Sequence, residues 1–288
     1  RDRSPSRGLG DVYKRQMNFN IAKNSNKLVE LADGVDSYSI YWTSFTTRLY
    51  NYAMVGKSLG VITGNTWERD DNGNIIFHEL SASQKALYGG EYVPTYNQNT
   101  LDELGNFHPD FTGGFNTSIS FKNFRLSANI DFSVGGQIVS YTNMWGSSSG
   151  ILDKTAELND RGVNVREPVS KGGGIHMTGV DQNGNKVDTY VNAKLYYTTA
   201  SRVWEEWVYD RTYVKLREVS LSYVFPSQTL KKLNIGLSRA SVAINASNPW
   251  LIYSACPNVD VSEIGMGYFE GGNAAATRSI GFTVNLAF

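Results

Sequence analysis

The stretch that decides the fold is Tyr209–Trp250, which reads YDRTYVKLREVSLSYVFPSQTLKKLNIGLSRASVAINASNPW. It contains two strand patterns joined by a short polar turn. From Val219 to Phe225 the odd positions are apolar, while Ser220 and Ser222 between them are small and polar. Apolar residues that recur with a period of two are typical of a β-strand with two different faces. The stretch therefore predicts strand structure.

The alternation changes phase within the first of these strand patterns. Val214 and Leu216 place the apolar side chains on even positions, whereas from Val219 onward they fall on odd positions. One extra residue in a strand produces such a change, so we expect a β-bulge at Arg217 and Glu218.

The second strand pattern returns after a break at Pro226. Gln228 to Asn234 is expected to form the turn, and Ile235 to Ala246 resumes the alternation. Two alternating runs joined by a short polar segment indicate a long antiparallel hairpin.

The last ten residues, SIGFTVNLAF, form a further strand pattern from Ser279 to Phe288. The apolar face would be the core of a soluble sandwich or would contact lipid in an outer-membrane barrel, and periodicity alone does not separate the two. A strand of about ten residues has the length needed to cross a bilayer when tilted. In the barrel interpretation the lipid-facing residues are Val219, Leu221, Tyr223, Phe225, Ile280, Phe282, Val284 and Leu286.

Composition excludes several classes of protein. The 288 residues carry no net charge, so a basic surface for nucleic acid is not expected, and the single Cys256 excludes an internal disulfide. Aromatic residues reach 12%, which suits strands. No run approaches 18 consecutive apolar residues, which argues against a membrane-spanning helix, although alternating strands escape that test.

The first sixteen residues, RDRSPSRGLGDVYKRQ, share no pattern with the residues after them and lack the apolar region of a signal peptide. They resemble a translated cloning or sequencing-adaptor scar. We therefore expect residues 1–16 to make no specific contact with the strands, and we exclude them from the predicted fold.

Further strands and their connections suggest a topology. Phe115–Phe121 and Phe124–Phe132 alternate on either side of a Lys122-Asn123 turn, and Met17–Ala22 and Leu28–Leu31 are expected to form another short-turn pair. Longer connections come after Leu31, Val134 and Ala246. Short turns at one end and long loops at the other are typical of an outer-membrane barrel. Seven strands are expected, with the last running toward the periplasm.

No motif predicts catalysis, a cofactor or a metal. Gly146–Gly150, GSSSG, matches a nucleophile elbow, but no helix is expected after it. The three histidines are far apart in the sequence. Asp181–Asn185 begins like a calcium loop but lacks the required Gly and Glu, so a tight Asn-Gly turn is the better interpretation.

Aromatic residues gather just before the strand that begins at Thr212. Trp204, Trp207 and Tyr209 could form an aromatic girdle at a membrane interface or a platform on which substrate rings stack. The girdle is the favoured interpretation.

Three segments resemble the SusC/RagA family of TonB-dependent outer-membrane transporters. They are PDFTGGFNTSISFKNFRLSANIDFSVGG (Pro109–Gly136), YDRTYVKLREVSLSYVFP (Tyr209–Pro226) and the strand ending in Asn248-Pro249-Trp250. The resemblance implies an all-β fold, namely the C-terminal part of a large antiparallel transmembrane β-barrel with long extracellular loops. It implies that residues 17–288 form a partial barrel whose plug and N-terminal strands are missing. It also implies that the chain ends on an assembly signal, Phe288.

The resemblance further implies location in the bacterial outer membrane and a function in nutrient import, with oligosaccharide or peptide as cargo. The implied partners are a SusD-like surface lipoprotein, the TonB complex through the missing N-terminal part, the barrel-assembly machinery and outer-membrane lipid. Such a protein is not an enzyme. The alternative is a secreted all-β module that binds carbohydrate or mediates adhesion, for which long loops and exposed aromatic residues would also serve.

Overall fold

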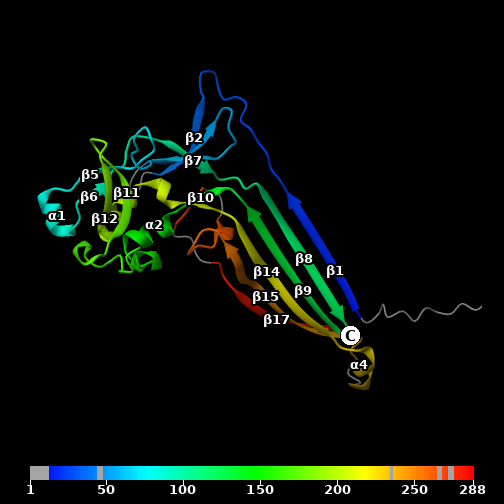
Figure 1. Ribbon diagram of the computed structural model, residues 1–288. Coiled ribbons are helices and arrows are strands. Elements are labelled where there is room, and N and C mark those ends of the chain that lie inside the picture. Colours follow the sequence, from blue (N-terminus) through cyan, green and yellow to red (C-terminus); the bar gives the residue numbers. More distant parts are fainter. Residues whose placement is uncertain (1–12, 44–47, 234–235, 265–267, 272–275) are drawn as a thin grey trace, which may run out of the picture.

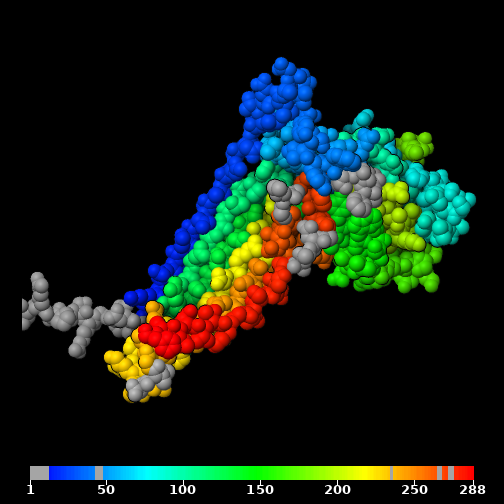
Figure 2. Space-filling view, turned by 180° about the vertical axis from the view of Figure 1, so that it is seen from behind, coloured from blue at the N-terminus to red at the C-terminus, as the bar shows by residue number. Residues whose placement is uncertain are grey.

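The computed structural model describes residues 13–43, 48–233, 236–264, 268–271 and 276–288. It has two parts, a long six-stranded antiparallel sheet and a lobe at one end of it (Figure 1). Figure 2 shows the same arrangement from behind, with the sheet as a narrow slab leading away from the lobe. Across the described ranges, no helix is long and apolar enough to span a membrane.

The six-stranded sheet contains two hairpins, β8-β9 and β14-β15, and segments of the lobe separate its other neighbouring strands in the sequence. Their order is β1-β8-β9-β14-β15-β17 and each pairs antiparallel with its neighbours. The strands are β1 (Tyr13–Ala22), β8 (Phe111–Phe121), β9 (Phe124–Val134), β14 (Tyr213–Val224), β15 (Arg239–Ser254) and β17 (Ser279–Ala287).

The two hairpins expected from the sequence are confirmed. β8 and β9 pair from Phe121 with Phe124 onward, around the two-residue turn. β14 pairs with β15, and its register shifts between Leu216 and Glu218, as expected for the bulge. The turn between β14 and β15 differs from the expectation because it contains a short helix, α4 (Ser227–Leu233). Ile235, expected to start the return strand, lies outside the described residues.

Two expectations for the N-terminal region are wrong. Leu28–Leu31 forms no strand, and Met17–Ala22 belongs to β1, which pairs with β8. The polar run after Ala22 therefore leads into the lobe and does not turn back at once. The sheet has six strands where seven were expected, and β1 runs in the opposite direction from the expected one, although β17 still ends at the end away from the lobe (Figure 1).

The expectation that residues 1–16 make no specific contact with the strands is wrong for Tyr13–Gln16. Tyr13–Gln16 are the first residues of β1 and pair with the end of β8, from Tyr13 with Phe121 to Gln16 with Ser118. Thr117 Oγ1 also donates to the carbonyl of Gln16 at 3.2 Å. Residues 1–12 lie outside the described residues.

The three long connections do not remain loops but fold together into the lobe. Its first sheet has the order β2-β3-β4-β7 and its second the order β12-β11-β5-β6; a small third sheet has the order β13-β10-β16. The strands are β2 (Ser37–Thr43), β3 (Leu49–Met54), β4 (Val61–Gly64), β5 (Ile76–Glu79), β6 (Tyr92–Pro94), β7 (Asp102–Asn106), β10 (Gln137–Ser140), β11 (Ile175–Asp181), β12 (Lys186–Val191), β13 (Val208–Asp210) and β16 (Phe269–Glu270).

Short helices complete the lobe. They are α1 (Ala82–Tyr88), α2 (Tyr141–Ser148) and α3 (Ala193–Ala200), with the 3-10 turns η2 (Asp153–Ala156), η3 (Val169–Lys171) and η4 (Trp204–Trp207). A further 3-10 turn, η5 (Val261–Glu263), lies where the lobe meets the long sheet. Helix α3 begins after a single residue, Asn192, at the end of β12. Asn192 explains the helix, because its side chain accepts from the amides of Lys194 and Leu195 and so caps the first turn.

Candidate functional site

Strand pairing gathers the polar positions of the long sheet on one face. Ser220 Oγ donates to Asn245 Oδ1 at 2.6 Å, and Asn245 Nδ2 donates to Thr283 Oγ1 at 3.0 Å. One row across all six strands runs Gln16, Ser118, Ser127, Ser220, Asn245 and Gly281. An open groove of about 700 Å³ on this face is lined by residues that include Arg125, Asn129 and Glu218. The face is suited to contact with water.

The opposite face of the same sheet is apolar. Leu221 pairs with Ile244, which pairs with Phe282, so the residues expected to face lipid in β14 and β17 share one surface. Val219 and Ile280 are linked in the same way through Ala246, and Tyr223 and Val284 through Val242. The apolar side chains of β17 are open to the surroundings, with Ile280 83% and Phe282 68% exposed, whereas Val219 and Tyr223 of β14 are half-buried. An apolar surface of this extent marks an interaction with lipid or protein.

Three of the expected residues lie at the margins of this apolar face. Leu286 is opposite Ala240 near the end of β17 and is 53% exposed. Phe225 comes directly after the last residue of β14, and its ring meets that of Tyr223 edge-on, with centroids 5.1 Å apart. Phe288 comes directly after β17 and is 85% exposed. All three lie at the end of the sheet away from the lobe, as Figure 1 shows for the C-terminus.

The aromatic residues expected to form a girdle or a stacking platform have a different position. Trp204 is 0% exposed and Trp207 1%, because η4 inserts both rings into the core of the lobe. Tyr209 in β13 is partly buried and packs beside Ile138, Cys256 and Val261. Neither tryptophan can contact headgroups or a substrate, so both interpretations are wrong for these two residues.

The polar residues of η4 also serve the interior of the lobe. Glu206 Oε1 accepts from the indole N–H of Trp67 at 2.6 Å, and Glu205 accepts from the backbone N–H of Trp67 at 3.1 Å. Arg69 pairs with Glu205 at 2.5 Å. The sequence WEEW thus combines two roles, with the tryptophans filling the core and the glutamates fixing a segment more than 130 residues earlier in the chain.

The lobe also has a partly open pocket that sequence reasoning missed. Its volume is about 570 Å³, in the range of small-ligand sites. The described residues that line it carry no charge; they are Tyr41, Tyr141, Thr142, Trp145, Gly146, Ser149, Ile151, Leu152, Phe269 and Gly271. Tyr41 stacks on Phe269 at 5.4 Å, and Trp145 remains 43% exposed. The pocket therefore suits a neutral group with an apolar surface.

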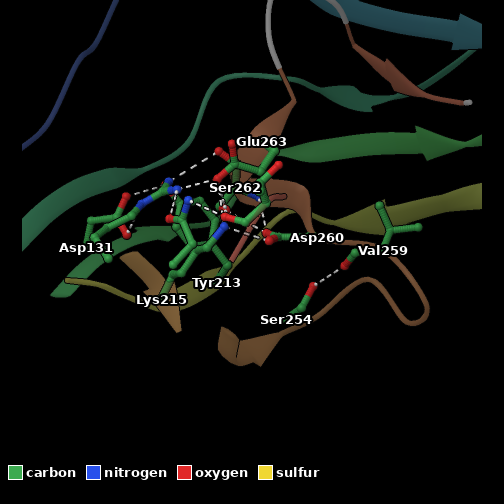
Figure 3. Close-up of polar contacts among 11 residues, drawn as sticks. Asp131, Tyr213, Lys215, Ser254, Val259, Asp260, Ser262 and Glu263 are labelled. Atoms are coloured by element: carbon green, nitrogen blue, oxygen red, sulfur yellow. Dashed lines mark hydrogen bonds and ion pairs between the residues drawn. The ribbon is translucent and has the colours of Figure 1, made fainter. Parts of the chain in front are cut away.

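A cluster of charges at the junction of sheet and lobe was also missed (Figure 3). Lys215 in β14 is 1% exposed, and its Nζ contacts Asp260 Oδ2 at 2.7 Å and Glu263 Oε1 at 2.7 Å. The only feature of the sequence that points to this cluster is the position of Lys215 on the polar face of β14. Its partners lie 45 and 48 residues later, and that separation explains why the pattern does not reveal them.

The motifs considered for chemistry do not form reactive sites among the described residues. Ser148 ends helix α2 and donates to the carbonyl of Trp145 at 3.1 Å, so it is not on a strand-to-helix elbow. Asp181 accepts from the amides of Asn183 and Asn185 at 2.8 Å, which confirms the Asn-Gly turn between β11 and β12. No metal-binding group of three or more His, Cys, Asp or Glu residues occurs in the described ranges.

With this geometry established, the chain can be compared with known proteins. Solved structures titled as the RagAB peptide importer in the "closed-closed" state and the RagAB peptide transporter match it with TM-scores of 0.61 and 0.59. Sequence identities are 15% and 14%, and each match covers 96% of this chain and 28% of the solved chain. The strand-rich fold is thus of the RagA type.

Curated relatives agree with this assignment. TonB-dependent receptor P3 of Formosa agariphila is 27% identical over 250 residues, covering 84% of this chain and 22% of the relative. TonB-dependent receptor P26 of the same organism is 23% identical over 318 residues, covering 97% and 28%. No family model matches the chain. The resemblance to SusC/RagA-like TonB-dependent transporters is confirmed, and the chain spans about a quarter of the length of these relatives.

Proposed function

We propose that this chain is part of the barrel of an outer-membrane transporter that imports a nutrient in a TonB-dependent manner. The observation that carries the proposal is the six-stranded sheet with one continuous polar face and one continuous apolar face. In a barrel the polar face would line a water-filled lumen and the apolar face would contact lipid. The named relatives, all receptors or importers, support this assignment.

The open sheet requires further strands to become a barrel. β1 and β17 are the outer strands of the sheet, and each pairs on one side only within the described residues. We propose that the remaining strands of the full-length protein close the barrel, that a plug lies inside it, and that the barrel-assembly machinery recognises the end at Phe288. The lobe would then lie at the extracellular mouth, and α4 with the Lys122-Asn123 turn would lie in the periplasm.

The partners and the cargo belong to the same proposal. The resemblance to SusC/RagA-like transporters supports a surface lipoprotein of the SusD type that would close over the lobe. Relatives named as TonB-dependent receptors support a TonB complex that would act on the N-terminal part. The uncharged pocket around Trp145 would hold a neutral group of the cargo, either an apolar peptide side chain or a sugar ring. The polar groove on the sheet would form part of the exit path. No covalent chemistry is required for import.

The secreted-module alternative makes a different prediction for the apolar face. A soluble module would bury this face in a core, whereas here Ile280, Phe282 and Leu221 stay largely exposed. Within the described residues the lobe contributes no layer over them. This observation favours the membrane protein.

The test uses the full-length protein expressed in the outer membrane of a strain that lacks its own copy. Impermeant thiol reagents should label Gln182→Cys, at the tip of the β11–β12 turn, on intact cells, and should label Gln228→Cys in α4 only after the outer membrane is opened. Cys256 can stay, because burial raises its pKa to about 12 and it is 1% exposed. Uptake of a fluorescent peptide or oligosaccharide mixture should require TonB. Equal labelling of both sites would overturn the topology, and TonB-independent uptake would overturn the mechanism.

A further inference from the structure

The buried ammonium group of Lys215 has all its ligands on one segment of chain. Besides Asp260 and Glu263, Nζ donates to Ser262 Oγ at 3.0 Å, so each of its three N–H groups has a partner (Figure 3). Lysine is seldom buried unless it is paired in this way. The cation belongs to β14 of the long sheet, and its partners all belong to the segment 255–264 that comes after β15. The contact therefore attaches this segment to the long sheet.

The β-bulge adds a second cation to the same contact. Arg217 is the extra residue of the bulge, and its Nε contacts Asp131 Oδ1 of β9 at 2.9 Å. Its Nη1 contacts Glu263. A bulge redirects a side chain without moving the rest of the strand to the other face. It thereby turns Arg217 toward the polar face while Leu216 and Val219 keep their apolar positions. The bulge thus places Arg217 where it can contact Glu263 at the junction of sheet and lobe.

The other side of the segment 255–264 is attached to the lobe. Asn143 of α2 donates to the carbonyl of Pro257 at 2.9 Å and accepts from Asn258 Nδ2 at 2.9 Å. Cys256 and Val261 are each 1% exposed and pack with Ile138 of β10. The segment is thus held by the sheet through charges and by the lobe through amide hydrogen bonds and a small apolar core.

We propose that Lys215, assisted by Arg217, is a positioning residue that sets the orientation of the whole lobe relative to the sheet by fastening the segment 255–264 to the polar face. The lobe would follow this segment, because the segment shares a core with it. The functional consequence rests on the proposed transporter. There, this attachment would hold the lobe and its uncharged pocket in place at the mouth of the lumen.

The experiment measures hydrogen exchange in the full-length protein in detergent at neutral pH. Lys215→Met should accelerate amide exchange in 255–264 and in α2 by at least about tenfold, because the carboxylates lose a buried partner. Lys57→Met is the matched control. Lys57 pairs with Glu103 at 2.9 Å, but the two side chains are 54% and 45% exposed, so removal of this pair should leave the same amides unchanged. Lys215→Arg, which keeps the charge, should restore most of the protection.

A second variant covers the case in which Lys215→Met does not assemble. Glu263 lies outside the strands, and Glu263→Gln keeps the size of the side chain. The substitution removes the negative charge and so weakens the contacts to Lys215 and Arg217 together. Spin labels at Gln182→Cys and Gln228→Cys should then report a broader distance distribution between lobe and sheet. Faster exchange confined to β14 and its strand neighbours, with an unchanged label distance, would show that Lys215 only stabilises the strand and would overturn the proposal. Failure of TonB-dependent uptake in the wild type would instead overturn the proposed function and leave this result standing.

Discussion

The lobe and the long sheet treat their large apolar side chains in opposite ways. Trp67, Trp204 and Trp207 in the lobe are 2%, 0% and 1% exposed, whereas Ile280, Phe282 and Leu221 in the sheet are 83%, 68% and 48% exposed. The lobe therefore carries its own core, as a soluble domain does. The sheet depends on its surroundings to cover its apolar face. One chain thus combines two kinds of stability, and we expect that each can be perturbed without the other.

The largest expected effect breaks the lobe alone. Trp204→Ala removes a fully buried ring that lies 5.0 Å from the ring of Tyr141, and loss of a buried tryptophan costs about 3–5 kcal/mol. In the full-length protein the lobe should become sensitive to protease, while the barrel should keep its heat-modifiable migration in gel electrophoresis. Simultaneous loss of both signals would show that the two parts fold as one unit.

The next effect breaks the sheet alone and tests which face meets lipid. Arg at a lipid-facing midplane position costs about 2–4 kcal/mol, and an Arg that faces water costs much less. Val284→Arg should therefore impair folding of the full-length protein into bilayers far more than Thr283→Arg, its neighbour on the polar face. A protein that folds in plain buffer without lipid or detergent, or that tolerates both substitutions equally in bilayers, would contradict the assignment.

A smaller effect tests whether the lobe takes part in the proposed cargo binding. An aromatic contact is worth about 0.5–1.5 kcal/mol beyond burial, so Trp145→Ala should weaken cargo binding by roughly two- to tenfold. Binding to the purified full-length protein can be followed by isothermal titration with the peptide or oligosaccharide that cells import. Trp42→Ala is the control, since Trp42 is 59% exposed on β2 and does not line the pocket. Equal losses in both variants would remove the pocket from the binding site.

The smallest effect is the response of the junction to acid. Burial opposes ionisation of Asp260, but hydrogen bonds from Lys215 and Ser262 outweigh it and hold the pKa of Asp260 below its usual value. The hydrogen bond from Lys215 lowers the pKa of Glu263 in the same way. Carboxylates with lowered pKa values stabilise the attached state above their ordinary pKa, and that stabilisation is lost as the pH falls through the lowered values.

This junction contains further charged and titratable groups, namely Asp131, Tyr213, Lys215 and Arg217. The label distance between lobe and sheet should therefore stay constant from neutral pH to about pH 5 and broaden only below about pH 4. Broadening near pH 6 would point to a group outside this junction. The same acid response should be absent in Lys215→Met, where the attachment is already lost.

The contrast between the two parts also explains how much of the fold was predictable. Strands β8, β9, β14 and β17 and the bulge at Arg217 could be predicted from the alternation of apolar and polar residues. This pattern is local, because residues two positions apart in a strand share a face regardless of tertiary contacts. The expected lipid-facing sets proved to share one surface for the same reason. The lobe was not predicted, since its order depends on contacts such as Trp67 with Glu206, which are 139 residues apart.

Particular errors have the same physical origin. Trp204 and Trp207 resemble interface aromatics in a linear pattern, and only the tertiary contacts of η4 show that they are buried. Leu28–Leu31 alternates too briefly to distinguish a strand from an irregular segment. The junction was missed because a lone lysine on a polar strand face gives no hint of the two carboxylates that approach it from another segment.

The two outer strands of the long sheet have a consequence for handling the protein. Within the described residues β1 and β17 each present one row of backbone N–H and C=O groups with no strand partner, beside an apolar surface. Such an edge is a template on which other chains add strands. Produced in water as this 288-residue piece, the polypeptide should polymerise edge to edge into inclusion bodies, and refolding would have to begin with detergent already present.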